Sequence, residues 1–67
     1  MVTVNKKERE RIVGENIYEL IEFSGNSEDT KPTENGERLV DNGSVFIEVD
    51  TGKIFFYDLE NEEWKEV

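Results

Sequence analysis

Residues 42–58, Asn42-Gly43-Ser44-Val45-Phe46-Ile47-Glu48-Val49-Asp50-Thr51-Gly52-Lys53-Ile54-Phe55-Phe56-Tyr57-Asp58, decide the fold class of this chain. Two runs of β-branched and aromatic residues flank the turn Asp50-Thr51-Gly52-Lys53, where glycine can take a positive φ without steric cost. This arrangement predicts a β-hairpin. Trp64 follows closely enough to lie on a third strand, after a second turn at Leu59-Glu60-Asn61-Glu62.

The turn chemistry also predicts a register for the hairpin. Asp50 and Thr51 suit the centre of a type I turn, and Gly52 suits the left-handed bulge that follows it. The expected pairs are Val49 with Lys53, Ile47 with Phe55, Val45 with Tyr57 and, on the opposite face, Phe46 with Phe56. Both faces of the ribbon would then carry aromatic rings, which an isolated sheet cannot bury.

The N-terminal half is harder to assign. Residues 1–14 are highly charged, and we expect a flexible tail there. Apolar residues between Lys6 and Phe23 recur near helical spacing, yet Gly14 interrupts them, so helix and strand both stay open, with a strand favoured from Asn16 to Phe23. Residues 24–42 form a long polar connection, which is either functional or disordered.

Together these features predict one mainly β domain over residues 15–67. Its expected architecture is a small antiparallel meander of three to four strands, preceded by a helical or disordered N-terminal segment.

Composition excludes several classes of function. The chain has 67 residues and a net charge of −9, with no cysteine and no histidine, so disulfides, cysteine-built metal or redox sites and a histidine general base are all excluded. An acidic body repels nucleic acid and anionic membranes. No apolar segment is long enough to span a bilayer, and no secretory signal is apparent. We expect a protein of the cytoplasm or of a soluble assembly.

Three short motifs have ordinary structural explanations. Asp50-Thr51-Gly52 matches the catalytic triplet of aspartic proteases, but those enzymes need two such carboxylates and a flap, so we interpret it as a structural turn. Asp58, Glu60, Glu62 and Glu63 crowd one turn but lack the spacing of a calcium loop. Asn42-Gly43-Ser44 satisfies the glycosylation sequon but fits a turn. The sequence therefore predicts no catalytic, cofactor-binding or metal-binding residues.

Aromatic residues are the remaining candidates for a functional role. Tyr and Trp are enriched in the centres of protein interfaces, and a small sheet leaves rings that need covering. The predicted interaction surface comprises Phe46, Phe55, Phe56, Tyr57 and Trp64.

The C-terminal part of the chain carries Asp29-Thr30-Lys31-Pro32, then Gly43-Ser44-Val45-Phe46-Ile47-Glu48-Val49-Asp50-Thr51-Gly52-Lys53, then Asp58 and Trp64. Over about residues 29–67 it resembles a small β-ribbon module from the structural regions of tailed bacteriophages and prophages. The resemblance implies a virion-associated head or tail protein, located in a virion or in the cytoplasm of a bacterial host, with no established catalytic residues to carry over. Its partners would be other virion proteins or a second copy of itself. We expect no enzymatic activity and no cofactor. The segment before Gly14 lies outside the matching pattern.

A second hypothesis follows from the charge alone. A surface this acidic could mimic nucleic acid and occupy a basic site on a host protein as a regulator. Salt would weaken that binding, whereas contact through aromatic side chains would tolerate salt.

Overall fold

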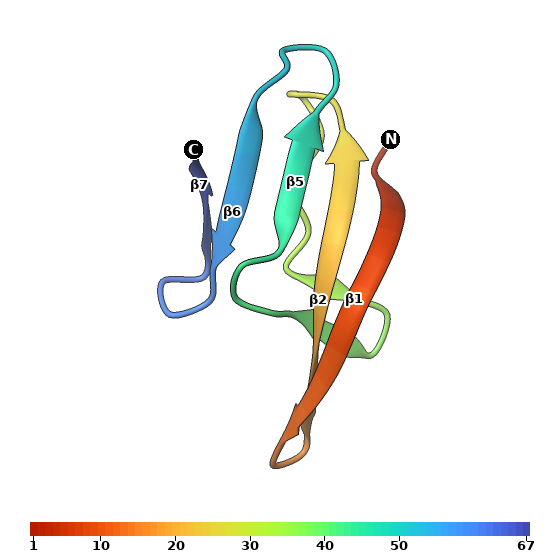
Figure 1. Cartoon of the computed structure of the whole chain (residues 1–67), viewed down its shortest axis with the longest axis vertical. Coiled ribbons are helices and arrows are strands. Elements are labelled where there is room, and N and C mark those ends of the chain that lie inside the picture. The colour runs from red at the N-terminus through yellow and green to blue at the C-terminus, as the bar shows by residue number, and fades with distance from the viewer.

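Seven strands make up the structure, a computed structural model that covers residues 1–67 (Figure 1). They are β1 (Thr3–Val13), β2 (Asn16–Gly25), β3 (Glu34–Asn35), β4 (Arg38–Val40), β5 (Val45–Glu48), β6 (Ile54–Asp58) and β7 (Glu63–Glu66). All seven belong to one sheet in the order β3-β4-β2-β5-β6-β7, and β1 pairs with β2. No helix in the structure has the length and apolar character that crossing a bilayer requires.

Strand β2 is the centre of the sheet. One edge of β2 pairs antiparallel with β1. The ladder begins where Thr3 lies opposite Ser24 and ends where Val13 lies opposite Asn16. The other edge of β2 is shared, because β4 pairs with it in parallel at Tyr18 and Glu19 and β5 pairs with it in parallel at residues 22–25. The prediction of a strand at 16–23 is thus confirmed.

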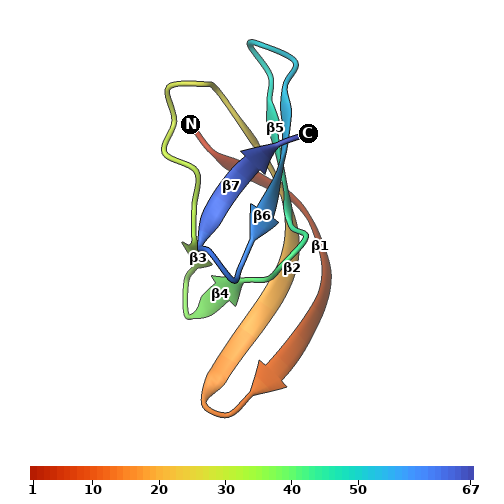
Figure 2. The same ribbon diagram turned by 90° about the vertical axis from the view of Figure 1, so that its left-hand side faces the viewer.

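The predicted antiparallel meander of three to four strands is wrong, because the sheet has seven strands and mixed pairing. Parallel neighbours need a long crossover, and residues 26–33 supply it by running back along β2 to the β3–β4 hairpin. Figure 2 shows this return segment standing off one face of the sheet. The length of the polar connection was the signal for a crossover.

The expectation of a helical or disordered N-terminal segment is also wrong. Residues 3–13 form β1, and Gly14 turns the chain into β2 with a φ of 60°. Every residue of β1 is exposed. The strand is therefore held by its ladder to β2 and by side-chain ion pairs, which composition could not distinguish from a solvated helix.

The β5–β6 hairpin forms where it was predicted, but its register differs by one residue. The observed pairs are Val45 with Phe56, Phe46 with Phe55, and Ile47 with Ile54. Residues 49–53 connect the two strands, and the Val49 amide donates to the carbonyl of Gly25 at 2.8 Å and so continues the ladder to β2. Gly52 has a positive φ of 77°. A one-residue slip moves side chains to the opposite face, so Phe56 leaves the face that holds Phe46.

The core lies on the concave inner face of the curled sheet. It consists of Ile21, Phe23, Val40, Phe46 and Tyr57, with Val2, Phe55, Leu59 and Trp64 packed around them. Buried positions alternate along β2, which is the periodicity of a strand with one covered face. The return segment covers this inner face, where Trp64 Nε1 donates to the carbonyl of Pro32 at 3.0 Å.

The two faces of the hairpin can be tested with a matched pair of aromatic substitutions. Phe46 is fully buried, and Phe46→Ala should lower the free energy of unfolding by about 3–5 kcal/mol. Phe56 is 46% exposed, and Phe56→Ala should cost about 1 kcal/mol or less. Urea unfolding measures both. Equal losses would contradict the observed register.

Candidate functional site

The predicted aromatic interaction surface is divided by the structure. Phe46 and Tyr57 are buried core residues, and Phe55 and Trp64 are partly buried against them. Only Phe56 is substantially exposed. The four inner rings therefore stabilise the fold and leave Phe56 as the ring available to a partner.

Trp64 occupies the middle of the aromatic cluster. Its ring centroid lies 5.0 Å from that of Tyr57, 5.9 Å from Phe46 and 6.1 Å from Phe23. The tilted and edge-to-face geometries are those that aromatic pairs favour. With its indole N–H bonded to Pro32, Trp64 joins β7, the core and the return segment.

Three buried carboxylates each have a cationic partner. Glu48 accepts a hydrogen bond from Lys31 Nζ at 2.7 Å and another from Thr51 Oγ1 at 2.7 Å. Asp41 accepts two bonds from the Arg11 guanidinium, both at 2.9 Å, and Glu19 lies 3.9 Å from Arg38. No buried side-chain nitrogen or oxygen lacks a hydrogen-bond partner. The Arg11–Asp41 pair joins β1 to the segment between β4 and β5, and the Lys31–Glu48 pair joins the return segment to β5.

The Asp50-Thr51-Gly52 triplet lies in the β5–β6 turn. The Asp50 carboxylate accepts bonds from the amide and hydroxyl of Ser27, at 2.9 and 2.6 Å. The hydrogen bond from the Ser27 hydroxyl is the main cause that lowers the pKa of Asp50. Each side chain of the triplet that can bond therefore has a partner within the fold, with Thr51 bound to Glu48.

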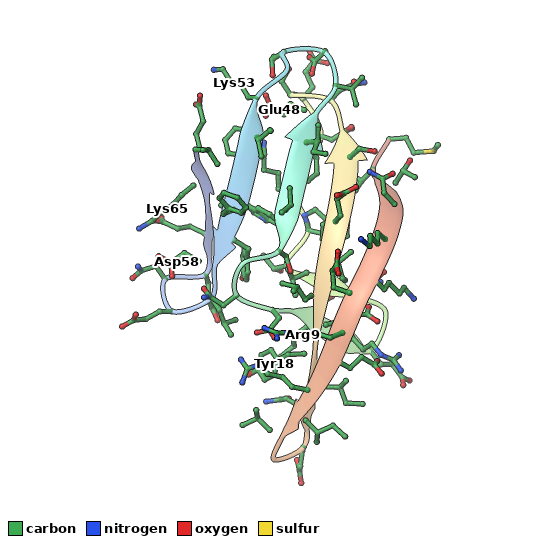
Figure 3. The ribbon with its side chains drawn as sticks, viewed as in Figure 1. Arg9, Tyr18, Glu48, Lys53, Asp58 and Lys65 are labelled. Atoms are coloured by element: carbon green, nitrogen blue, oxygen red, sulfur yellow. The ribbon has the colours of Figure 1, made fainter.

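The acidic residues of the β6–β7 turn do not converge. Asp58 is bonded to Asn61 and to Lys65, whose Nζ lies 3.1 Å away, and Figure 3 shows Asp58 and Lys65 on neighbouring strands. No group of three or more His, Cys, Asp or Glu side chains is placed to hold a metal ion.

An apolar patch lies on the convex side of the hairpin. We call it the β5–β6 outer face, and it comprises Val45, Ile47, Ile54 and Phe56. These residues alternate with the buried positions of the same strands and form two cross-strand pairs. Ile54 and Phe56 are 43% and 46% exposed. No other layer of the chain covers this face.

Two cavities are present. An open crevice of about 450 Å³ is lined only by charged residues, namely Lys7, Glu8, Arg9, Glu10, Glu19 and Arg38. Its cations and carboxylates balance, and Arg38 pairs with Glu10 across it. A second cavity, of about 200 Å³, is more apolar and more enclosed. We call it the aromatic pocket, and its walls are Tyr18, Thr33, Leu39, Tyr57, Leu59 and Glu62.

Comparison with protein-family models, with curated proteins and with solved structures found no match in any of the three.

Sequence reasoning missed both the β5–β6 outer face and the aromatic pocket. Ile54 and Phe56 were visible as strand residues, but the one-residue register shift decided which way they point. Tyr18 and Leu39 were assigned to unrelated segments, and only the parallel pairing of β2 with β4 places them opposite each other.

The ion pairs on the buried carboxylates predict acid sensitivity. Hydrogen bonds from Arg11 lower the pKa of Asp41, and those from Lys31 and then Thr51 lower the pKa of Glu48, from ordinary values of 3.8 and 4.5. A depressed folded-state pKa contributes stability that is present above the unfolded pKa and is lost as pH falls through the folded one.

The free energy of unfolding should therefore be constant near neutral pH and should decline as pH falls below about 4. Asp41→Asn and Glu48→Gln should each lower stability at pH 7 and flatten this decline. Urea unfolding at a series of pH values measures the slope. Unchanged slopes in both variants would show that the two carboxylates do not govern it.

Glu62 is the one residue other than glycine with a positive φ, at 53°. This conformation is strained for a residue with a Cβ. We expect Glu62→Gly to raise the free energy of unfolding by about 1 kcal/mol. Glu60→Gly, in the same turn without a positive φ, should lower it by about 0.5–1 kcal/mol. Thermal melts compare the two, and a loss in both would show that Glu62 is not strained.

Proposed function

We propose that this chain is a small non-catalytic accessory protein that acts by protein–protein contact, in head or tail assembly of a tailed phage or prophage. The observation that supports contact best is the β5–β6 outer face, where Ile54 and Phe56 are 43% and 46% exposed beside the half-buried Val45 and Ile47. Exposed apolar patches of this kind mark interaction sites.

The bonding of the polar groups favours a binding role over catalysis. A catalytic carboxylate usually sits where its surroundings leave it free to exchange a proton or meet a substrate. Here the buried carboxylates of Glu19, Asp41 and Glu48 are each engaged by a cation that fastens one element to another. That the protein is not an enzyme stays a prediction.

The virion setting is taken from the resemblance described above. In the structure, the residues that carry the resemblance hold the framework: Lys31 pairs with Glu48, Pro32 accepts from Trp64, and Asp50 caps Ser27. A shared pattern of this sort would specify a common fold. Modules that share the fold could then differ in what they bind.

The contact is proposed through the face of the sheet and not through its edge. The free edge of β1 carries a dense run of charged residues, and its pairing with β2 is interrupted by register shifts after Val4 and after Lys7. Charges and bulges are the devices that prevent edge strands from pairing with other chains. The partner is another virion protein or a second copy of this chain.

Incorporation into particles tests the proposal. The chain should co-purify with particles produced from the genomic region that encodes it, and the double variant Ile54→Ser/Phe56→Ser should reduce its amount in them about tenfold or more. Ile12→Ser removes an equally apolar side chain, 74% exposed, from the tip of β1 and should leave incorporation unchanged. Quantitative mass spectrometry of purified particles measures the amounts of the wild-type chain, the double variant and Ile12→Ser.

Absence of the wild-type chain from those particles would contradict the virion role. Equal incorporation of the double variant would contradict the use of the β5–β6 outer face. Circular dichroism of both variants checks that each is folded.

The acidic-regulator hypothesis is retained because many carboxylates form no ion pair. They come from several turns and strands: Glu15, Glu22, Glu28, Glu34, Glu37, Asp50, Glu60 and Glu62. Such a regulator would be released from its host partner by moderate salt, whereas contact through Phe56 and Ile54 would survive it. Elution of captured host proteins over a salt gradient separates the two.

A further inference from the structure

The aromatic pocket has the size and walls of a site for a single side chain. Its volume of about 200 Å³ is below the roughly 300–1,000 Å³ of ordinary small-molecule sites, so it does not suit a nucleotide or an organic cofactor. Leu39 and Leu59 supply aliphatic walls, and Tyr18 and Tyr57 supply two aromatic rings. Figure 3 shows Tyr18 on the lower part of β2.

The charge of the pocket selects the kind of group that fits. Glu62 is its only charged lining residue, and no lysine or arginine lines it. Burial, followed by the negative charges of Glu62 and Asp58, raises the pKa of the Tyr57 hydroxyl. Tyrosine faces and a carboxylate both attract a cation.

The ring of Tyr18 already lies beside one cation of the chain itself. The guanidinium carbon of Arg11 lies 4.8 Å from the centre of its ring. Arg11 does not line the pocket, and its charge is compensated by two hydrogen bonds to Asp41. The carboxylate of Glu62 forms no ion pair within the chain and is free to meet a cation from a partner.

The backbone of Glu62 supports a role for this side chain. Glu62 has a φ of 53° and its amide donates to the carbonyl of Leu59 at 3.2 Å, in a turn where glycine or asparagine would be less strained. Strained residues of this kind gather at ligand sites. Here the strained position is the one that brings a carboxylate to the aromatic pocket.

We propose that the aromatic pocket binds a lysine side chain of a partner polypeptide. The apolar stem would lie against Leu39 and Leu59, with the ammonium group beside Glu62 and the tyrosine rings. Lysine fits better than arginine because its charge is compact and its four-carbon stem is flexible, whereas the planar guanidinium fork is wider. The proposal rests on the proposed function only in taking the partner to be a protein.

Titration with small probes followed by amide NMR tests the pocket directly. Nα-acetyl-lysine N-methylamide, which keeps a free ε-ammonium group, should shift the amide signals of Tyr18, Leu39, Leu59 and Glu62 in a saturable way. N-acetyl-norleucine N-methylamide has the same stem without the ammonium group and should bind about fivefold more weakly or worse. Equal affinity for the two probes, or no saturable shift at these residues, would overturn the proposal.

Charge and ring substitutions localise the effect. Glu62→Gln keeps the length and backbone demand of the side chain, and it should weaken the lysine probe about fivefold while leaving the norleucine probe unchanged. Glu60→Gln, in the same turn outside the pocket, should change neither. Tyr18→Leu should weaken the lysine probe as well. Equal effects of Glu62→Gln and Glu60→Gln would show a general charge effect and overturn the site.

These measurements are independent of particle incorporation. A chain that binds the lysine probe but is absent from particles keeps the pocket and loses the virion role. A chain that is incorporated through Ile54 and Phe56 but does not bind the probe loses the pocket alone. Trp64 fluorescence, which reports the core, checks that every variant is folded.

Discussion

The docking of Trp64 against the return segment is the interaction on which the rest of the structure depends. A chain of 67 residues folded as one sheet has two faces and too few residues to cover both. Trp64 packs on Phe23, Phe46 and Tyr57 and donates its indole N–H to Pro32, and this closes the inner face. On the outer face, Ile54 and Phe56 stay 43% and 46% exposed.

Ion pairs hold in place the elements that bury little apolar surface. Lys31 brings the return segment to Glu48 and also lies 4.2 Å from the ring centre of Phe55. Arg11 brings the exposed strand β1 to Asp41. Buried carboxylates of this kind are costly unless paired, so each pair holds its element in one place and also occupies a group that could otherwise have served chemistry. The fold uses its buried charges for structure.

The two sites proposed for function lie at the surface and differ in character. The β5–β6 outer face is apolar, as suits contact with another apolar surface. The aromatic pocket is small, concave and negative, as suits one cationic side chain. Neither is visible in a linear motif, and the motif residues Lys31 and Trp64 are used within the framework.

Local chemistry along the chain was enough to predict the strand at 16–23, the hairpin around Gly52 and the third strand carrying Trp64, because β-branched and aromatic runs between turn residues are signals that act over a few positions. The register of that hairpin, the strand character of residues 3–13 and the parallel pairing of β2 with β4 and β5 were decided only by the tertiary structure. Each depends on a hydrogen bond or ladder to a distant residue, such as the Val49 amide with Gly25, and short-range propensity carries no information about such partners.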